Sequence, residues 1–431
     1  MGVFAVAFSG KYRYARRMKF APLVAGLILA AAPPVWAAPA KVFPKGAAAV
    51  EAALREALRK PEGDLTRADL HKVTMLGIAR RQVRDLAPLT NAVSLKSLWL
   101  HHNHIHSLQP LTSMAQLEHL FLSQNQISDL APLVGCRSLR TLVLDQNRIH
   151  TLTPLANLRG LQRLTLWHNQ VTNLAPLSGM VKLQTLVLNN NRINDLRPLA
   201  SLRAMRALHL SHNRPQNLAP LAGMTKLEVL HLENCQTSDL RPLAALRELR
   251  SLRLHGNQIT DLEPLVALTK LTELHLTHNK VTDLTPLKEL KELRTLYLDS
   301  NQITQLKGLE ELTALKELSL NNNPQLDIPY IINLQRTLPK CVIHHNTTRT
   351  EIRFVNRTKA PVVIKWVNFQ GILETYDSGL RPMAIRNQNT YVGHEWVMLT
   401  PQGKELGRVF ATPQPILWEI AADGVKRAPR K

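Results

Sequence analysis

Apolar and polar positions recur along this chain with a period of 22 residues. In one unit, Leu98 and Leu100 flank Trp99, so the two leucines face one side of a short strand and the tryptophan faces the other. Ile105 and the leucines after it complete an apolar wedge, which a lone unit of this length cannot bury. The pattern therefore predicts a solenoid in which each unit packs against its two neighbours.

Two further columns follow the same spacing. An asparagine leaves each strand, and its amide both donates and accepts hydrogen bonds, so it can satisfy backbone groups at every turn. This column is Asn103, Asn125, Asn147, Asn169, Asn191, Asn213, Cys235, Asn257, Asn279, Asn301 and Asn323, in which Cys235 is a tolerated gap. A proline column starts each return segment, where proline fixes φ and donates no hydrogen bond. It is Pro88, Pro110, Pro132, Pro154, Pro176, Pro198, Pro220, Pro242, Pro264 and Pro286, and Gly308 interrupts it.

The unit L-x-L-x-x-N-x-[IV]-x-[DN]-L-x-P-L resembles the bacterial 22-residue leucine-rich repeat of the internalin type, over residues 73–345. The resemblance implies an α/β solenoid, a horseshoe with a parallel sheet on its concave face and short turns on its convex side. Both ends of such a stack need a cover. We expect a helical cap over residues 41–72, because residues 47–59 are amphipathic and Thr66 begins a capping sequence. Residues 328–338 are expected to close the other end.

After His345 the 22-residue register ends, and short β-runs separated by turn residues follow. They predict a small all-β sandwich over residues 346–421 and a basic tail over 422–431. The expected strands are residues 351–357, 361–368, 383–388, 394–399, 407–411 and 416–420.

Three segments of this sandwich resemble the β domain of the von Hippel-Lindau tumour suppressor: FVNRT (354–358), VVIKWVNFQG (362–371) and YVGHEW (391–396). In that family the domain captures a peptide that carries 4-hydroxyproline. The resemblance implies a peptide-binding site made of Trp366, Tyr376, Thr390, Tyr391, His394 and Trp396. Asn389 departs from the family, which has a histidine there, and we expect no counterpart of the family's ligase-recruiting helical domain. The alternative is that the tryptophans are only core aromatics.

The outward residue of each solenoid strand lines the concave face. Candidate binding residues there are Trp99, Phe121, Trp167, His209, His231, Arg253, His275 and Tyr297. Exposed aromatics and arginine commonly anchor protein interfaces, although Trp99 and Phe121 could instead rest on the N-terminal cap. His209 and His231 fall on adjacent strands, but no acidic or cysteine ligand completes a metal site, and we expect no cofactor. A pH-responsive partner surface and an ordinary polar lining both remain open.

Residues 1–40 read as a signal peptide, with a basic stretch over 11–19, an apolar run over 20–32 and small residues at Ala37, Ala38 and Ala40. Met18 is an alternative start. An uncleaved anchor is the competing interpretation, but the apolar run is shorter than the ~20 residues that a membrane span needs. We therefore expect an exported chain, periplasmic or secreted, with no transmembrane span in its mature form.

The net charge narrows the classes of binding partner, and the cysteine spacing argues against a disulfide framework. The formal net charge of +22 would suggest nucleic acid for a cytosolic protein, whereas an exported one meets anionic envelope polymer or lipopolysaccharide instead. Cys136, Cys235 and Cys341 are too scattered for a disulfide framework and are expected as buried thiols.

The sequence contains no nucleophile elbow, zinc-protease helix, P-loop or dinucleotide fingerprint. We therefore expect a non-enzymatic protein-binding protein. Its concave face would hold a folded partner, and its sandwich would take an extended peptide, for which the resemblance implies recognition of hydroxyproline. The alternative function is a structural envelope component that binds anionic polymer or lipopolysaccharide through its basic surface.

Overall fold

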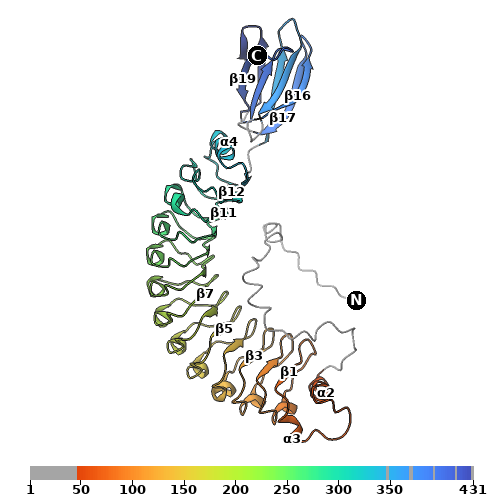
Figure 1. Ribbon diagram of the computed structural model, residues 1–431, viewed down its shortest axis with the longest axis vertical. Coiled ribbons are helices and arrows are strands. Elements are labelled where there is room, and N and C mark those ends of the chain that lie inside the picture. Colours follow the sequence, from red (N-terminus) through yellow and green to blue (C-terminus); the bar gives the residue numbers. More distant parts are fainter. Residues whose placement is uncertain (1–45, 346–348, 368–371, 392–393, 413–414, 429–431) are drawn as a thin grey trace. The chain divides into compact units, whose positions relative to one another are not determined.

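The computed structural model describes residues 46–345, 349–367, 372–391, 394–412 and 415–428. The expected signal peptide at 1–40 lies outside these residues. Within the described chain, a repeat solenoid is followed by a β-sandwich (Figure 1). This confirms the fold class expected from the sequence.

The solenoid carries a parallel sheet of 13 strands in which every strand pairs with its neighbours in sequence. Leu98 pairs with Leu120, and Trp99 pairs with Phe121, so identical repeat positions form straight rows across the sheet. The sheet lines the inner side of the curve (Figure 1). Its strands are β1 (Met75–Gly77), β2 (Ser97–Trp99), β3 (His119–Phe121), β4 (Thr141–Val143), β5 (Arg163–Thr165), β6 (Thr185–Val187), β7 (Ala207–His209), β8 (Val229–His231), β9 (Ser251–Arg253), β10 (Glu273–His275), β11 (Thr295–Tyr297), β12 (Glu317–Ser319) and β13 (Val342–His344).

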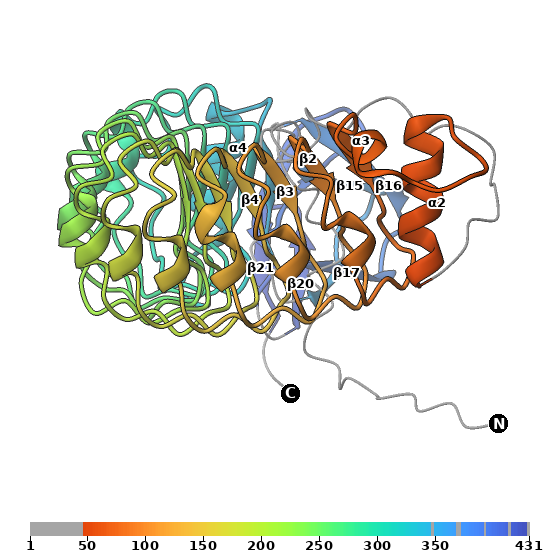
Figure 2. The same cartoon turned by 90° about the horizontal axis from the view of Figure 1, so that it is seen from below.

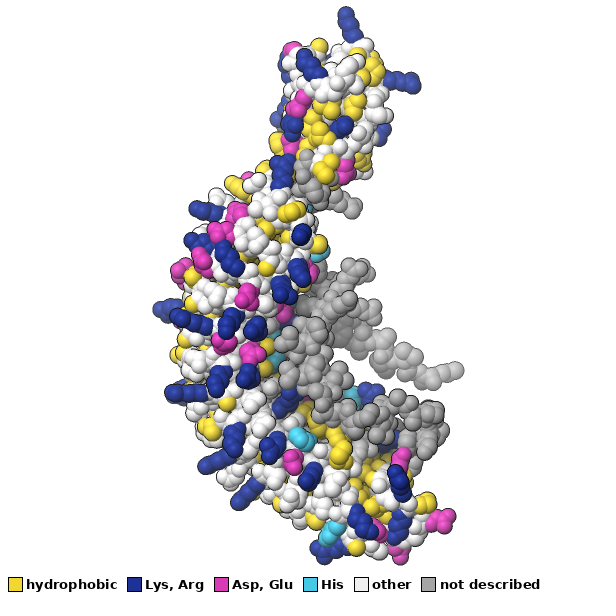
Figure 3. All heavy atoms as spheres, in the orientation of Figure 1, with side chains coloured by type: hydrophobic (Ala, Val, Ile, Leu, Met, Phe, Trp, Pro, Cys, Tyr) yellow, Lys and Arg dark blue, Asp and Glu magenta, His cyan; other side chains and the backbone are white. Residues whose placement is uncertain are grey.

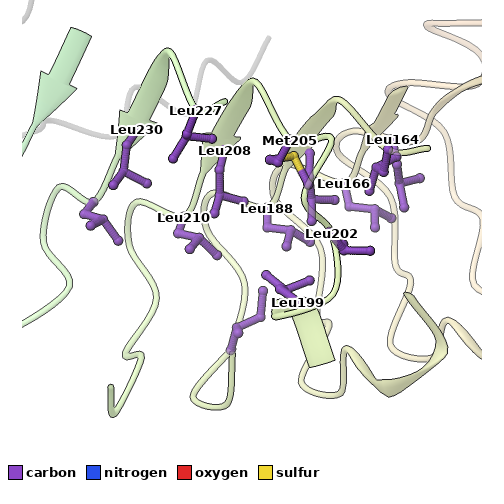
Figure 4. Packing of buried hydrophobic residues seen from close by; sticks show 14 of the residues in the cluster. Leu164, Leu166, Leu188, Leu199, Leu202, Met205, Leu208, Leu210, Leu227 and Leu230 are labelled. Atoms are coloured by element: carbon purple, nitrogen blue, oxygen red, sulfur yellow. The ribbon is translucent and has the colours of Figure 1, made fainter. Parts of the chain in front are cut away.

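The core is a continuous stack of leucines between this sheet and the outer turns. Leu186, Leu208 and Leu210 are fully buried, and Met205 belongs to the same buried cluster. Figure 4 shows how side chains from successive repeats interdigitate. Burying one leucine contributes roughly 1.5–3 kcal/mol, so each repeat depends on its neighbours for its stability.

The asparagine column joins each repeat to the one before it. Asn125 Nδ2 donates to the carbonyls of Leu100 and Leu122, each at 3.0 Å, and its Oδ1 accepts the N–H of Ile105 at 3.0 Å. One buried amide thus satisfies main-chain groups of two repeats. Asn103 does the same for the first repeat, where Arg81 and Val83 donate to its Oδ1.

The gap at Cys235 coincides with a second departure one repeat earlier. In the other repeats the N–H that donates to the asparagine belongs to an isoleucine, valine or threonine, but here the matching residue is Pro215, which has no N–H. An amide oxygen at position 235 would therefore lose this donor. The Cys235 thiol instead donates to the Leu210 carbonyl at 3.3 Å. Pro215 and Cys235 are therefore a matched pair.

Short 3₁₀ helices form the outer side of the solenoid, each with a proline in its first turn. Asp129 shows the local cause, because its carboxylate accepts the N–H of Ala131 at 2.8 Å and begins the turn. Gly308 ends the series with a φ of 98°, in a place where a Cβ would lie 2.9 Å from the Leu284 carbonyl oxygen. The 3₁₀ helices are η3 (Ala87–Leu89), η4 (Gln109–Leu111), η5 (Ala131–Gly135), η6 (Thr153–Leu155), η7 (Ala175–Leu177), η8 (Arg197–Leu199), η9 (Ala219–Leu221), η10 (Arg241–Leu243), η11 (Glu263–Leu265) and η12 (Thr285–Glu289).

Helices cover the solenoid at both ends. Helix α2 (Ala47–Leu58) lies at the N-terminal end of the solenoid (Figure 2). Its Val50 and Leu54 are buried in the common core. Helix α3 (Arg67–Leu70) begins with a capping box between Thr66 and Asp69. At the other end, α4 (Ile328–Thr337) adds Ile331 and Leu334 to the same core.

The described residues of the sandwich form two four-stranded sheets, ordered β17-β14-β20-β21 and β16-β15-β18-β19. Each of the six expected strands overlaps an observed one. Strand β16 was not expected, and β21 lies inside the segment expected as a basic tail. The strands are β14 (Arg349–Asn356), β15 (Val362–Val367), β16 (Leu373–Leu380), β17 (Ile385–Tyr391), β18 (Glu395–Leu399), β19 (Glu405–Phe410), β20 (Ile416–Ala421) and β21 (Gly424–Arg427).

Replacing one asparagine of the column tests its role. In Asn169→Ala, the Leu144 and Leu166 carbonyls lose an amide donor and the Ile149 N–H loses its acceptor. An unsatisfied buried polar group costs about 1–3 kcal/mol, so we expect a loss of at least that size in the free energy of unfolding, measured by urea titration. Asn194→Ala, at an exposed position of the next repeat, is the matched control and should leave the midpoint unchanged.

Candidate functional site

The sandwich brings five of its six candidate residues into one aromatic cluster. Trp366 on β15 and Trp396 on β18 are direct cross-strand partners. The Tyr376 ring lies 5.1 Å from that of Trp396, and the His394 ring stacks at 5.1 Å on that of Trp366. Thr390 closes the cluster from the other sheet. The sixth candidate, Tyr391, ends β17, and its side chain lies outside the described residues.

Tyr376 owes its position to an irregularity in β16. Lys365 pairs with Thr375 and Ile364 pairs with Asp377, so Tyr376 is the extra residue of a β-bulge. A bulge turns its side chain out of the regular alternation. The phenol is 47% exposed and accepts a hydrogen bond from Gln388 Nε2 at 2.8 Å. Sequence reasoning missed Gln388, although it shares the face of Thr390 two residues further along.

A hydroxyl and a neutral imidazole meet at the centre of the cluster. Thr390 Oγ1 lies 3.2 Å from His394 Nδ1, and both side chains are buried. Burial lowers the pKa of His394 to about 4, with a smaller contribution from His345. The imidazole is therefore neutral near pH 7 and can accept at one nitrogen while it donates at the other.

Trp396 also belongs to the sandwich core. It is 2% exposed, and its ring lies 5.9 Å from that of the fully buried Phe354. Trp366 is half-buried at the border of the same core. The two tryptophans thus differ, because Trp396 supports the fold while Trp366 and Tyr376 keep part of their surface accessible.

On the solenoid, the outward row begins with aromatic residues. The Trp99 and Phe121 rings stack in parallel at 5.7 Å with an interplanar angle of 6°, and both remain half-buried. Trp167 lies in a neighbouring row, two residues beyond the outward position of its repeat, and is 39% exposed. These three side chains give the first half of the concave face its apolar character.

His209 and His231 form a buried pair in the middle of the outward row. Their Nδ1 atoms lie 2.8 Å apart, and the side chains are 6% and 7% exposed. Burial, assisted by the Arg253 charge, lowers the pKa of His209 to about 4. Burial also lowers the pKa of His231, as do the charges of His209, Arg253 and His275. At neutral pH the pair is therefore uncharged.

The remaining candidates of the row already have partners. Arg253 Nη2 and His275 Nε2 each lie 2.7 Å from Glu273 Oε1. Burial raises the pKa of Glu273, but the hydrogen bond from His275 and the charge of Arg253 outweigh it and lower that pKa to about 2. The Tyr297 ring lies 4.5 Å from that of His275, and burial together with Glu317 raises the pKa of Tyr297 to about 12. This half of the face is polar but internally compensated.

A row of polar side chains directly beyond the strands escaped sequence reasoning. Asp145 accepts the N–H of Trp167 at 2.8 Å and the Thr165 hydroxyl at 2.9 Å. Burial raises the pKa of Asp145 to about 6, although those bonds and one from Ser123 oppose the rise. Asp299 likewise accepts the N–H of Asn321 at 3.0 Å. The recurrence of polar residues at this position was the available signal.

Metal ligands, thiols and membrane-spanning helices can each be assessed within the described residues. Among them, no group of three or more histidine, cysteine, aspartate or glutamate side chains is arranged to hold a metal ion. Cys136, Cys235 and Cys341 are free and buried, as expected, and burial raises the pKa of each thiol. The helices within the described chain are too short or too polar to cross a bilayer.

Comparison with known structures identifies the family of the solenoid. Internalin inlF from Listeria monocytogenes superimposes with a TM-score of 0.66 at 30% sequence identity, covering 69% of this chain and 89% of the internalin. The chain belongs to the internalin-type leucine-rich-repeat proteins. The leucine-rich-repeat family model matches this internalin-type chain at residues 115–157, 159–201, 247–289 and 291–333. The VHL beta domain model matches residues 343–405 and confirms the second resemblance.

More distant structures share the fold. The functional domain of InlJ from Listeria monocytogenes matches with a TM-score of 0.53 at 16% identity, over 84% of this internalin-type chain and 95% of InlJ. The ectodomain of the receptor kinase GASSHO1/SCHENGEN3 from Arabidopsis thaliana matches with a TM-score of 0.53 at 21% identity, over 66% and 40% of the two chains. A search of the curated proteins finds no match.

The low pKa of His394 predicts how stability depends on pH. An unfolded histidine takes up a proton near pH 6.5, but His394 does so only near pH 4, so protons bind the unfolded chain first. Stability is therefore complete above pH 6.5 and falls towards pH 4, by about 1.4 kcal/mol per pH unit for one such imidazole. Urea titration of the sandwich tryptophan fluorescence across this range measures the slope. His394→Gln should flatten it, whereas His150→Gln, at an exposed position, should not.

Proposed function

We propose that this internalin-type chain is an exported, non-enzymatic protein-binding protein. In this proposal the sandwich captures an extended peptide that carries a hydroxylated proline, and the concave face of the solenoid holds a folded partner. The observation that carries the proposal is the buried contact between Thr390 and His394 beneath the accessible rings of Trp366 and Tyr376.

The chemistry of this cluster suits a ring that bears one hydroxyl. A ligand hydroxyl both donates and accepts, and Thr390 with a neutral His394 can supply the complementary acceptor and donor. Aromatic faces favour the apolar part of a pyrrolidine ring. Plain proline would enter the same space without pairing the buried hydroxyl and imidazole, which is costly. The match to the VHL beta domain supports the same assignment.

The strand beside the cluster supports an extended ligand. In the described sandwich, β17 is an edge strand that pairs only with β14. Its free edge leaves main-chain donors and acceptors for an added strand. Thr390 lies near the end of β17, so a peptide that pairs with this edge would pass the Thr390–His394 contact.

Protein recognition on the concave face is supported by its aromatic residues. Trp99 and Phe121 present a stacked pair, and aromatic side chains are the usual anchors of interfaces. The alternative is binding of anionic polymer through basic charge. Figure 3 shows Lys and Arg side chains spread along the solenoid, and several of them, such as Arg197 and Arg241, already pair with neighbouring aspartates. This spread favours protein recognition.

Hydroxyproline recognition is tested with a pair of synthetic peptides that differ only in one hydroxyl. We expect the unaltered chain to bind the hydroxylated peptide about 10–100-fold more tightly, since an unpaired buried polar group costs about 1–3 kcal/mol. Isothermal titration calorimetry measures both affinities. His394→Ala should remove the preference while the matched control His150→Ala retains it. Equal affinity of the unaltered chain for both peptides would contradict the assignment.

The concave face is tested by affinity capture of proteins from cell-envelope and host extracts. Trp99→Ala with Phe121→Ala should release proteins that the unaltered chain retains, and His394→Ala should not. Capture through apolar contacts should persist when salt is raised from 0.1 to 1 M, whereas binding of anionic polymer should decline steeply. A capture lost in high salt and indifferent to the aromatic pair would favour the envelope-polymer alternative.

A further inference from the structure

One interface between neighbouring repeats, which we call a joint, has different hydrogen bonds from the others. At the joint between β6 and β7, Ile193 donates to Asn213 Oδ1 at 2.9 Å, and Arg214 donates to the Ile193 carbonyl at 3.0 Å. These two bonds lie at the edge where the asparagine column runs. Among the described joints from β1 to β12, only the one between β7 and β8 lacks both bonds. Pro215 has no N–H to donate, and Gln236 does not donate to the Pro215 carbonyl.

Side chains replace these bonds on the opposite, concave side of the same joint. His209 Nδ1 meets His231 Nδ1 at 2.8 Å. The Ser211 hydroxyl donates to Glu233, and Arg206 pairs with Glu228. The main-chain ladder between the strands is intact, with Leu210 N–H donating to the His231 carbonyl at 2.8 Å. The joint is therefore held on its sheet side, whereas its asparagine edge lacks these two bonds and keeps the thiol bond from Cys235 to the Leu210 carbonyl.

We propose that the β7/β8 joint is the hinge of the solenoid, closed near neutral pH by the His209–His231 bridge and opened by acid. The bridge needs one unprotonated Nδ1 as its acceptor, so it cannot survive protonation of both imidazoles. Opening would turn the seven strands β1–β7 as a lever of about 29 Å, given a strand spacing of about 4.8 Å. A rotation of about 10° at the hinge would move β1 by about 5 Å.

The charges that face the pair favour this behaviour. On the β9 side lies Arg253, whose positive charge Glu273 partly balances, and beyond it lies His275 of β10, which also contacts Glu273. On the β6 side the row continues with the uncharged Val187. Glu233, two residues beyond β8, accepts a hydrogen bond from Ser211, and Arg206 and Glu228 compensate each other. Protons on both imidazoles would therefore repel each other and Arg253.

The lowered pKa of His209 fixes the direction of the effect. An opened joint would return His209 towards the ordinary pKa of about 6.5, against about 4 when closed. Acid therefore favours the open form between these values. For His209 alone, the ratio of open to closed forms should rise about 20-fold between neutral pH and pH 5.

Amide hydrogen exchange of the full chain tests the hinge without any partner. Leu210 and His212 donate main-chain bonds across the β7/β8 joint, and Leu166 and His168 donate the equivalent bonds across the β5/β6 joint. After correction for intrinsic exchange rates, protection at Leu210 and His212 should fall at least tenfold from pH 7.5 to pH 5. Protection at Leu166 and His168 should not change. Far-UV circular dichroism at both pH values confirms that the chain stays folded.

Two variants distinguish opening of the hinge from a general loss of stability in acid. Pro215→Ile with Cys235→Asn restores the N–H and its asparagine acceptor, so the pH effect at Leu210 should shrink. His209→Gln removes one titrating member of the bridge and should also reduce the pH dependence, which keeps the proposal testable if the double variant does not fold. His150→Gln should behave as the unaltered chain. No loss of protection at pH 5, or an equal loss at the β5/β6 joint, would overturn the proposal.

Discussion

Each turn of the solenoid buries main-chain carbonyl and amide groups that the short strands cannot pair, and an asparagine side chain meets this need across the boundary between two repeats. Asn125 is typical, with two carbonyls as acceptors and one N–H as donor. The leucine stack supplies most of the apolar burial, but it does not have, by itself, a fixed register between the residues of consecutive repeats. The asparagine bonds do, because they form only when consecutive repeats differ by a full unit. Straight rows of equivalent residues follow, and those rows define the concave face.

The repeat architecture was predictable because its period is carried by buried residues with a single role. Leu98 and Asn103 recur in chemistry as well as in spacing, and tertiary context offers them no alternative. Strand β16, at the edge of one sheet of the sandwich, was harder to predict. Strand β16 contains Asp377, Ser378 and Gly379, which favour turns, and its bulge at Tyr376 breaks the alternation that indicates a strand. Cross-strand pairing overrode these local preferences.

The candidate sites show the same division between what sequence reveals and what folding adds. Family resemblance identified Trp366, Thr390 and His394, and the structure brings them together. The resemblance could not reveal that Gln388 donates a hydrogen bond to Tyr376, because this bond joins strands of two different sheets. On the solenoid, spacing placed Arg253 and His275 in the outward row. Only the structure shows that Glu273, two residues before His275 on the same strand, engages both of them.

The pairing of Pro215 with Cys235 limits how such an array can change its length. Most units could be duplicated or deleted by recombination between copies, because any asparagine fits any preceding isoleucine. A deletion that placed Pro215 before an ordinary unit would bury an amide oxygen opposite a residue that cannot donate. One that placed Cys235 after an ordinary unit would leave an isoleucine N–H unsatisfied. These two units are therefore inherited together, and growth or loss of the array is easiest on either side of them.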